Sequence, residues 1–314
     1  MNNLSSAGSK VKRSPCEKAF NRREIFGLMI KFGSPTLWIT ISPATVHSPI
    51  FLRLANDRQI DFDLLDIPSH TERAKLVANN PVAAAIYYNT IIDEFTNYIL
   101  GWIDKLNGGI FGHVETFYGM TEEQGTGTLH NHMLAWLRGI KSASELRLLF
   151  EDDQFKDDLM KYLDRIIREG FLDTDDFDET VDVSEVSCKN PVNPEDHAND
   201  FFYNEALRDD VNKLVKVANT HSCRETCYKY RKTKKCRFGY PREKVSQTEI
   251  TDEKVIKKKR THEMVNNFNP ALMTCVRSNH DIKFVPSGKD GKILHFMCVI
   301  MLLSRNCQVN KYCH

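Results

Sequence analysis

The sequence predicts an α+β fold that combines an antiparallel hairpin with amphipathic helices. Val114–Met120 and Leu129–Leu137 are rich in β-forming residues, and the glycine-containing segment between them is typical of a hairpin connection. The apolar residues that follow Pro81 recur with helical periodicity, and proline suits the first turn of a helix. Cysteines, a histidine and basic residues gather after residue 220, which indicates a small additional segment with its own chemistry.

Shorter patterns predict the remaining elements. Arg23–Lys31 has a helical apolar pattern that ends at the Gly-Ser-Pro sequence following it. Thr36–Ile41 then alternates in the manner of a strand. Ser142–Arg168 and Phe202–Ala218 have helical patterns, and the acidic stretch between them is predicted to be a linker.

The composition is that of a globular protein whose charge is unevenly distributed. The chain has 314 residues, of which 41% are hydrophobic and 27% charged, and its net charge is only +1. Phe171–Ser187 has seven acids and no base, whereas Arg224–Arg260 has fourteen bases and five acids. A polyanionic partner is therefore expected to bind the second stretch.

Several protein classes are not expected from the sequence. The chain has no apolar run of the roughly 20 residues that a membrane span needs and no signal peptide, so we expect an intracellular protein without a membrane partner. In that compartment its cysteines are thiols or metal ligands. Ser287-Gly288-Lys289-Asp290 lacks the spacing and the hydroxyl of a phosphate-binding loop, so no ATP site is expected.

A histidine pair is the first candidate site. His130 and His132 stand two residues apart in the second hairpin strand, so both imidazoles project from one face. Glu122 and Gln124 precede the turn and can face them, which would complete a three-ligand open metal site. The alternative interpretation is a polar, exposed strand face without a ligand.

A cysteine and histidine cluster is the second candidate site. His221, Cys223, Cys227 and Cys236 supply four zinc-type ligands within sixteen residues, among bases that favour thiolates. The alternative is four thiols without a metal. The adjoining sequence YKYRKTKKCRFGYPR mixes aromatic and basic residues, which suits single-stranded DNA, although a solvated basic loop has the same composition. The predicted DNA-binding residues are Lys229, Arg231, Lys232, Lys234, Lys235 and Arg237.

The segment around the histidine pair resembles a known signature. YGMTEEQGTGTLHNHMLAWL is similar to the motif of the Helitron-like transposon Rep (HUH endonuclease) family, also called the Helitron helicase-like domain, in which Glu-x-Gln leads through a glycine to His-x-His. The residues in register are Glu122, Gln124, Gly127, His130 and His132. Thr126 replaces the usual base before the glycine, and Asn131 replaces a small or apolar residue.

Further blocks extend this resemblance over roughly residues 23 to 296. They read FGSPTLWITISPATVHSPIFLRLA, NNPVAAAIYYNTIIDEFTNYILG and VNNFNPALMTCVRSNHDIKFVPSGKD, in the family's order. The resemblance implies an HUH-endonuclease-like central antiparallel sheet flanked by helices, with Mg²⁺ or Mn²⁺ on the histidine pair. It also implies a nuclear protein that acts on single-stranded DNA at a transposon end, and a covalent intermediate formed by one tyrosine of a Tyr-x-x-x-Tyr helix.

We divide the chain on this basis. Residues 23–170 are the Rep-like nuclease core that carries the His-x-His motif. Zinc, Zn²⁺, is expected in the basic segment within residues 201–245. The other segments are a flexible basic lead-in at 1–22, an acidic linker or insertion at 171–200, a helix with the zinc-binding basic segment at 201–245, a return to the Rep-like core at 246–296, and an out-of-frame tail at 297–314.

The catalytic tyrosine pair is missing where the resemblance places it. Met297 and Met301 stand at the expected positions, four residues apart. Methionine codons begin with AT. When the codon before each methionine, that of Phe296 or Ile300, ends in T, the shifted frame reads TAT, a tyrosine codon. With permitted codons this shifted reading continues Tyr-Val-Cys-Asn-Tyr-Val-Thr-Lys. We therefore expect a frameshift near Phe296, no in-frame catalytic residue, and no role for Tyr312.

The sequence thus predicts a truncated Helitron helicase-like domain that has lost its tyrosines and its helicase and is inactive as a DNA nickase. The alternative is a non-catalytic, zinc-stabilised protein that binds single-stranded DNA. A relic without a selected role is a third interpretation.

Overall fold

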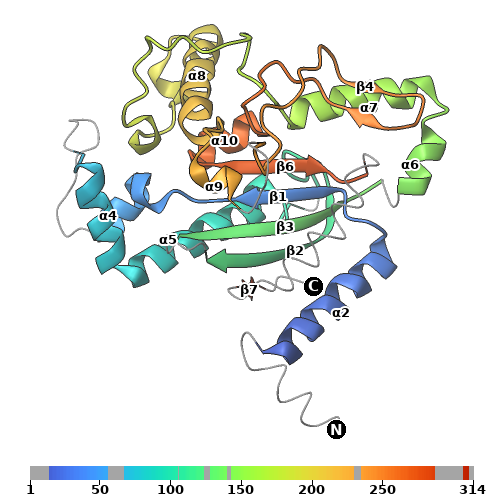
Figure 1. Cartoon of the computed structure of the whole chain (residues 1–314), viewed down its shortest axis with the longest axis horizontal. Coiled ribbons are helices and arrows are strands. Elements are labelled where there is room, and N and C mark those ends of the chain that lie inside the picture. The colour runs from blue at the N-terminus through green and yellow to red at the C-terminus, as the bar shows by residue number, and fades with distance from the viewer. Residues whose placement is uncertain are drawn as a thin grey trace.

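The computed structural model describes residues 14–55, 67–104, 106–123, 128–139, 143–229 and 235–286, and the backbone of 307–310. It confirms the α+β class, with one antiparallel sheet at the centre and helices around it (Figure 1). The strand order is β6-β1-β3-β2-β7, so β3 is an interior strand. The strands are β1 Leu37–Ile41, β2 Val114–Glu123, β3 Leu129–Leu137, β6 His280–Phe284 and β7 Cys307–Asn310.

Helices surround the central sheet. In Figure 1, α8, α9 and α10 gather beside β6, while α4 and α2 lie at opposite ends of the molecule. Among the described residues, none of the helices has both the length and the apolar character needed to cross a bilayer. The helices are α2 Pro15–Phe32, α3 Pro49–Ala55, α4 His70–Asn79, α5 Pro81–Glu94, α6 Ala143–Leu149, α7 Asp153–Ile166, α8 Asp200–Leu214, α9 Glu225–Tyr228 and α10 Pro270–Val276.

Short turns and one small hairpin complete the described fold. The π-helical turns η2 Phe95–Ile99 and η5 Val215–Asn219 continue α5 and α8. The 3-10 turns are η1 Thr45–His47, η3 Val186–Cys188 and η4 Pro194–Asp196, and the hairpin is β4 Glu249–Ile250 with β5 Ile256–Lys257.

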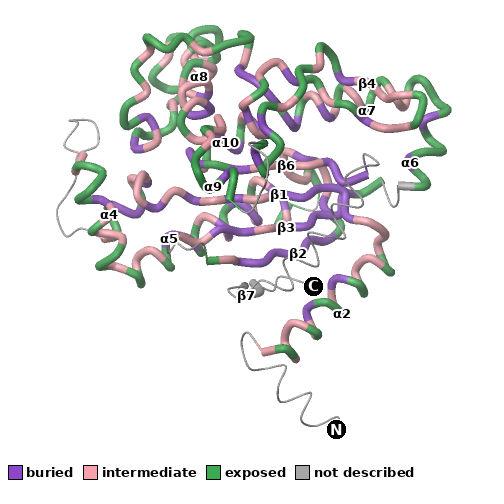
Figure 2. Tube along the Cα trace, in the orientation of Figure 1, coloured by how far each residue is buried: buried purple, intermediate pink, exposed green. Residues whose placement is uncertain are grey.

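The two faces of the sheet are covered differently, because side chains alternate along each strand. Met133 and Ala135 of β3 belong to the main core, together with residues of α5 and α7. Leu134 and Trp136 point to the other face, where a smaller cluster includes Ile25 of α2. Figure 2 shows the strands largely buried, whereas the outer sides of the helices are exposed. Helix α2 thus packs on the face that also carries the even-numbered residues of β3.

Most predicted elements are confirmed, but the single helix predicted over Ser142–Arg168 is wrong. Strand β2 continues to Glu123, so Glu122 lies within the ladder. The predicted helix Ser142–Arg168 is two helices, because Asp152 starts a new one by accepting hydrogen bonds from the backbone N–H groups of Gln154 and Phe155.

Two segments are more ordered than their composition indicated. Helix α2 begins at Pro15, inside the expected lead-in, because Ser14 caps it and proline fits its first turn. The acidic segment 171–200 contributes Val186 and Cys188 to the protein interior. Residues 297–306 and 311–314 of the expected out-of-frame tail lie outside the described part, while 307–310 pair with β2 as β7.

His280, the first residue of β6, connects the sheet to helix α10. Its side chain is fully buried. The backbone N–H of Asn269 donates to Nε2 at 3.0 Å, and Nδ1 donates to the carbonyl oxygen of Ser278 at 3.2 Å. Burial lowers the pKa of His280 to about 4, so the neutral ring is the folded form.

We expect this histidine to make the fold sensitive to acid. Its pKa is lower in the folded chain than in the unfolded chain. Its contribution to the free energy of unfolding is therefore fully present above about pH 6.5 and is lost as the pH falls towards 4. The loss attributable to His280 is at most about 3 kcal/mol. Urea unfolding at several pH values should show a weaker pH dependence for His280→Gln than for the unmodified chain. The partly exposed His197→Gln is the control, and an unchanged slope in His280→Gln would contradict the assignment.

Candidate metal centres

The structure brings His130, His132 and Glu122 to one point. The Nε2 atoms of the two histidines are 3.0 Å apart. Oε2 of Glu122 lies 3.2 Å from Nε2 of His130 and 3.3 Å from Nε2 of His132. The side chain of Glu122 is 29% exposed, so the point of convergence is open to a ligand. We call these three residues the histidine-pair centre.

Strand register produces this arrangement. Glu122 of β2 pairs directly with His130 of β3, and His132 is two residues further on the same face. Gln124, the other predicted ligand, lies outside the described residues together with Gly127. The spacing of Glu122 and His130 across a hairpin could therefore be predicted from the sequence.

A residue that sequence reasoning missed orients His132. Thr40 of β1 pairs with His132, and its Oγ1 lies 2.9 Å from Nδ1 of the ring. Trp38 Nε1–H donates to the same oxygen at 3.1 Å. When Nδ1 carries the proton and donates to Thr40, the Nε2 lone pair faces Glu122 and His130. No local signal in the sequence identifies Thr40, because its role depends on the pairing of β1 with β3.

The electrostatics of the centre favour the neutral imidazole at His130. Burial lowers the pKa of His130, the neighbouring His132 lowers it further, and Glu122 opposes both effects. Nδ1 of His130 is buried without a hydrogen-bond partner among the described residues. Two imidazole nitrogens and a carboxylate oxygen are donors that divalent cations accept, so the residues present fit a metal ion.

His221, Cys223, Cys227 and Cys236 also converge, and we call them the cysteine-histidine centre. Nε2 of His221 is 3.3 Å from the sulfur of Cys223, 3.6 Å from that of Cys227 and 3.3 Å from that of Cys236. All four donor atoms lie within 4.8 Å of one another. One tetrahedral ion with bonds of about 2.0 to 2.3 Å can reach all four.

Neighbouring groups hold this centre in place. The ring of Tyr240 stacks on His221 with 4.3 Å between centroids and an angle of 14°. Burial raises the pKa of Cys236, but backbone N–H groups of Tyr240 and Phe238 and the thiols of Cys223 and Cys227 outweigh it, so the net shift is downward. The downward shift favours the metal-binding thiolate at Cys236, whereas the pKa of Cys223, which Tyr228 lowers, is raised on balance by burial and the neighbouring Cys236.

The basic segment beside the cysteine-histidine centre is only partly described. Lys229, Lys235 and Arg237 are exposed, and the guanidinium of Arg237 lies 4.6 Å from the ring centroid of Phe238. Phe238 is half exposed, so it is accessible for stacking. The other predicted DNA-binding residues, Arg231, Lys232 and Lys234, lie outside the described part of the chain.

A basic hollow runs along β6. It has a volume of about 430 Å³, and the basic side chains among its lining residues outnumber the acidic ones, Glu169 and Glu243. Lys283 pairs with Trp38, so it belongs to the sheet face that carries the histidine pair. The basic residues are Arg242, Lys257, Lys258, Arg260 and Lys283.

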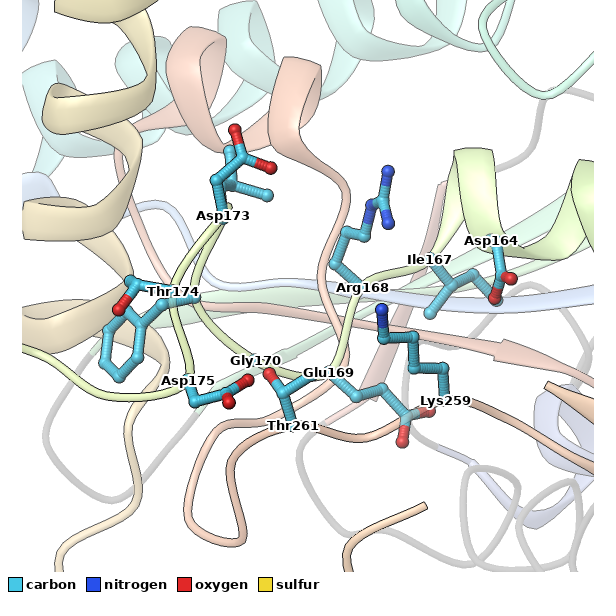
Figure 3. Close-up of a pocket in the computed structure, with 12 residues that line it drawn as sticks. Asp164, Ile167, Arg168, Glu169, Gly170, Asp173, Thr174, Asp175, Lys259 and Thr261 are labelled. Carbon is cyan, nitrogen blue, oxygen red and sulfur yellow. The ribbon is translucent and has the colours of Figure 1, made fainter. Parts of the chain in front are cut away.

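Another hollow, of about 310 Å³, lies where α7 leads into the acidic segment (Figure 3). Asp164, Asp173 and Asp175 line it together with Arg168 and Lys259. Its described lining contains neither histidine nor cysteine, and its charges are mixed. The donor sets of the two centres are therefore the better candidates for a functional site.

Comparison with known proteins finds a similarity to a family over the first part of the chain. Residues 1–135 match the model of the Helitron helicase-like domain at N-terminus. The match includes the histidine-pair centre and ends before the cysteine-histidine centre. No curated protein matches the chain.

We expect the hydroxyl of Thr40 to be needed for metal binding at the histidine pair. Thr40→Val keeps the shape of the side chain but removes the acceptor for His132, and loss of such a partner typically weakens metal affinity about 10- to 100-fold. Titration calorimetry with Mn²⁺ measures this effect. Thr71→Val, at an exposed position of α4, is the control. Equal affinities for the two variants would contradict the role of Thr40.

Proposed function

We propose that this chain, whose residues 1–135 belong to the Helitron helicase-like domain family, carries the DNA-nicking (HUH endonuclease, Rep) centre of a rolling-circle transposon. The observation that supports the proposal most strongly is the convergence of His130, His132 and Glu122 on one face of an antiparallel sheet. We place the protein in the nucleus, as its family would require.

The histidine-pair centre would hold Mg²⁺ or Mn²⁺ through the Nε2 atoms of His130 and His132 and an oxygen of Glu122. When bound, such an ion polarises a phosphate oxygen. Thr40 orients His132 through Nδ1, and when Nδ1 carries the proton the Nε2 lone pair would be available to the ion. The exposed edge of Glu122 leaves an approach for a phosphate group.

Single-stranded DNA, specifically a transposon end, is the proposed substrate. Lys235, Arg237 and Phe238 offer charge and an aromatic face beside the cysteine-histidine centre, for which we propose zinc. Lys283, which lines the basic hollow, would add positive charge to the sheet face that carries the histidine pair. These features support backbone neutralisation along an extended strand.

The nucleophile is the missing component. Met297 and Met301, where a tyrosine pair is expected, lie outside the described residues, and the chain has no in-frame tyrosine at these positions. A metal that polarises phosphate does not replace the residue that forms the covalent bond. This observation favours a second function, a non-catalytic protein that binds single-stranded DNA.

We expect the full chain to bind single-stranded DNA with strong salt dependence. Lys235→Ala/Arg237→Ala should weaken binding and reduce the slope of log affinity against log salt by about 0.7 for each phosphate that the variant no longer neutralises. Fluorescence anisotropy with a labelled oligonucleotide measures both quantities. Lys161→Ala, which removes an exposed base of α7 that pairs with Asp157, is the control. Identical slopes for the double variant and the control would argue against this surface.

The same preparation should neither cut DNA nor become attached to it in Mn²⁺. A chain that continues after Phe296 as Tyr-Val-Cys-Asn-Tyr-Val-Thr-Lys should gain Mn²⁺-dependent nicking, and His132→Ala in that chain should abolish it. A gel-stable adduct formed by the present sequence would show that another nucleophile exists. DNA binding without nicking by the restored chain would favour the non-catalytic function.

A further inference from the structure

A third group of metal-binding side chains lies away from both centres. It consists of His47, in turn η1 after β1, and of Glu185 and Cys188, which flank and end turn η3. The sulfur of Cys188 is 3.9 Å from Nδ1 of His47 and 3.2 Å from Oε2 of Glu185. All three donor atoms lie within 4.8 Å of one another.

We propose that His47, Glu185 and Cys188 bind a structural zinc ion. Thiolate, imidazole and carboxylate are all zinc ligands, and bonds of about 2.0 to 2.3 Å separate the donors of a tetrahedral site by roughly 3.3 to 3.8 Å. The two distances from the sulfur of Cys188 bracket this range. The inference concerns the scaffold and does not depend on the proposed DNA chemistry.

Turn η3 is fixed so that two of the ligands point to the same place. Glu185 has a left-handed backbone with φ of 55°, and its carbonyl oxygen accepts from the N–H of Cys188 at 2.8 Å. Arg277 donates to the carbonyl oxygen of Val186 at 2.6 Å and pairs with Asp210 of α8 at 2.7 and 2.8 Å. A non-glycine residue in this conformation costs about 1 kcal/mol or more, so its neighbours must stabilise the turn.

A simpler role explains two members of the group. Arg73 is 1% exposed, and its guanidinium contacts both oxygens of Glu185, at 2.8 and 3.2 Å. The thiol of Cys188 also donates to Oε2 of Glu185, at 3.2 Å. Neither contact accounts for His47, which lies 141 residues earlier in the chain and has its Nδ1 3.9 Å from the sulfur of Cys188.

Local charge fits an ion at this position, and a further histidine lies nearby. A thiolate and a carboxylate neutralise Zn²⁺, and the guanidinium of Arg73 pairs with the same carboxylate of Glu185. His70 is exposed, and its ring centroid lies 5.6 Å from that of His47, although His70 is not among the three residues whose donor atoms converge. Bound zinc would cross-link the loop after β1 to the acidic segment, and its binding free energy would stabilise the folded chain.

Zinc content of the purified full chain tests this site. The measurements use His130→Ala/His132→Ala as the background, because zinc can also occupy the histidine pair. With zinc in the growth medium and dialysis without chelator, mass spectrometry of the metal should find about two zinc ions per chain. Cys188→Ser and Cys236→Ser should each remove about one, and the two together should remove both. The exposed Cys275→Ser is the matched control and should keep both.

Two outcomes would overturn the third site: a zinc content in Cys188→Ser equal to that of the Cys275→Ser control, or a background chain whose zinc is lost entirely with Cys236→Ser alone. Because Cys188 is buried, His47→Gln provides a second test that leaves the thiol in place. Circular dichroism must show that this variant is folded, and its zinc content should also fall by about one ion per chain. Retention of the full zinc content by folded His47→Gln would equally contradict the site. DNA binding is not a readout, so this inference and the proposed function fail separately.

Discussion

The two-residue repeat of strand β3 determines which of its side chains enter the main core and which form the histidine-pair centre. It directs Met133 and Ala135 into the main core and directs His130 and His132 to the opposite face. The strand is interior to the sheet, so its backbone is held by β1 on one side and β2 on the other. A shift of one residue in either pairing would bury the imidazoles in the core and expose apolar side chains. Stability of the core thus maintains the geometry of the centre.

Each neighbour of β3 adds one component to the centre. Strand β2 supplies the carboxylate of Glu122, opposite His130, and β1 supplies the hydroxyl of Thr40, opposite His132. The next strand, β6, places Lys283 beside Trp38 and so extends the same face towards the basic hollow. Lys283 and the histidine pair therefore lie on one side of the sheet.

Features that depend on residues close together in the sequence could be predicted from the sequence. The hairpin and the spacing of His130 and His132 were predictable because period-two alternation and turn residues act over a few positions. The cysteine-histidine cluster was predictable because its ligands lie close in the sequence. Thr40 and the approach of His47 to Cys188 depend on tertiary pairing across about a hundred residues or more, which no local pattern records. The division of Ser142–Arg168 was missed because the cap formed by Asp152 competes with a continuous helical pattern.

We propose that the histidine pair and Glu122 hold one divalent ion. Anomalous X-ray diffraction from crystals of the chain soaked in Mn²⁺ locates the metal itself. We expect a single strong peak at the histidine pair, about 2.0 to 2.3 Å from the Nε2 atoms of His130 and His132 and from an oxygen of Glu122. A fully occupied peak elsewhere, with the two imidazoles hydrogen-bonded only to each other and to Glu122, would contradict it.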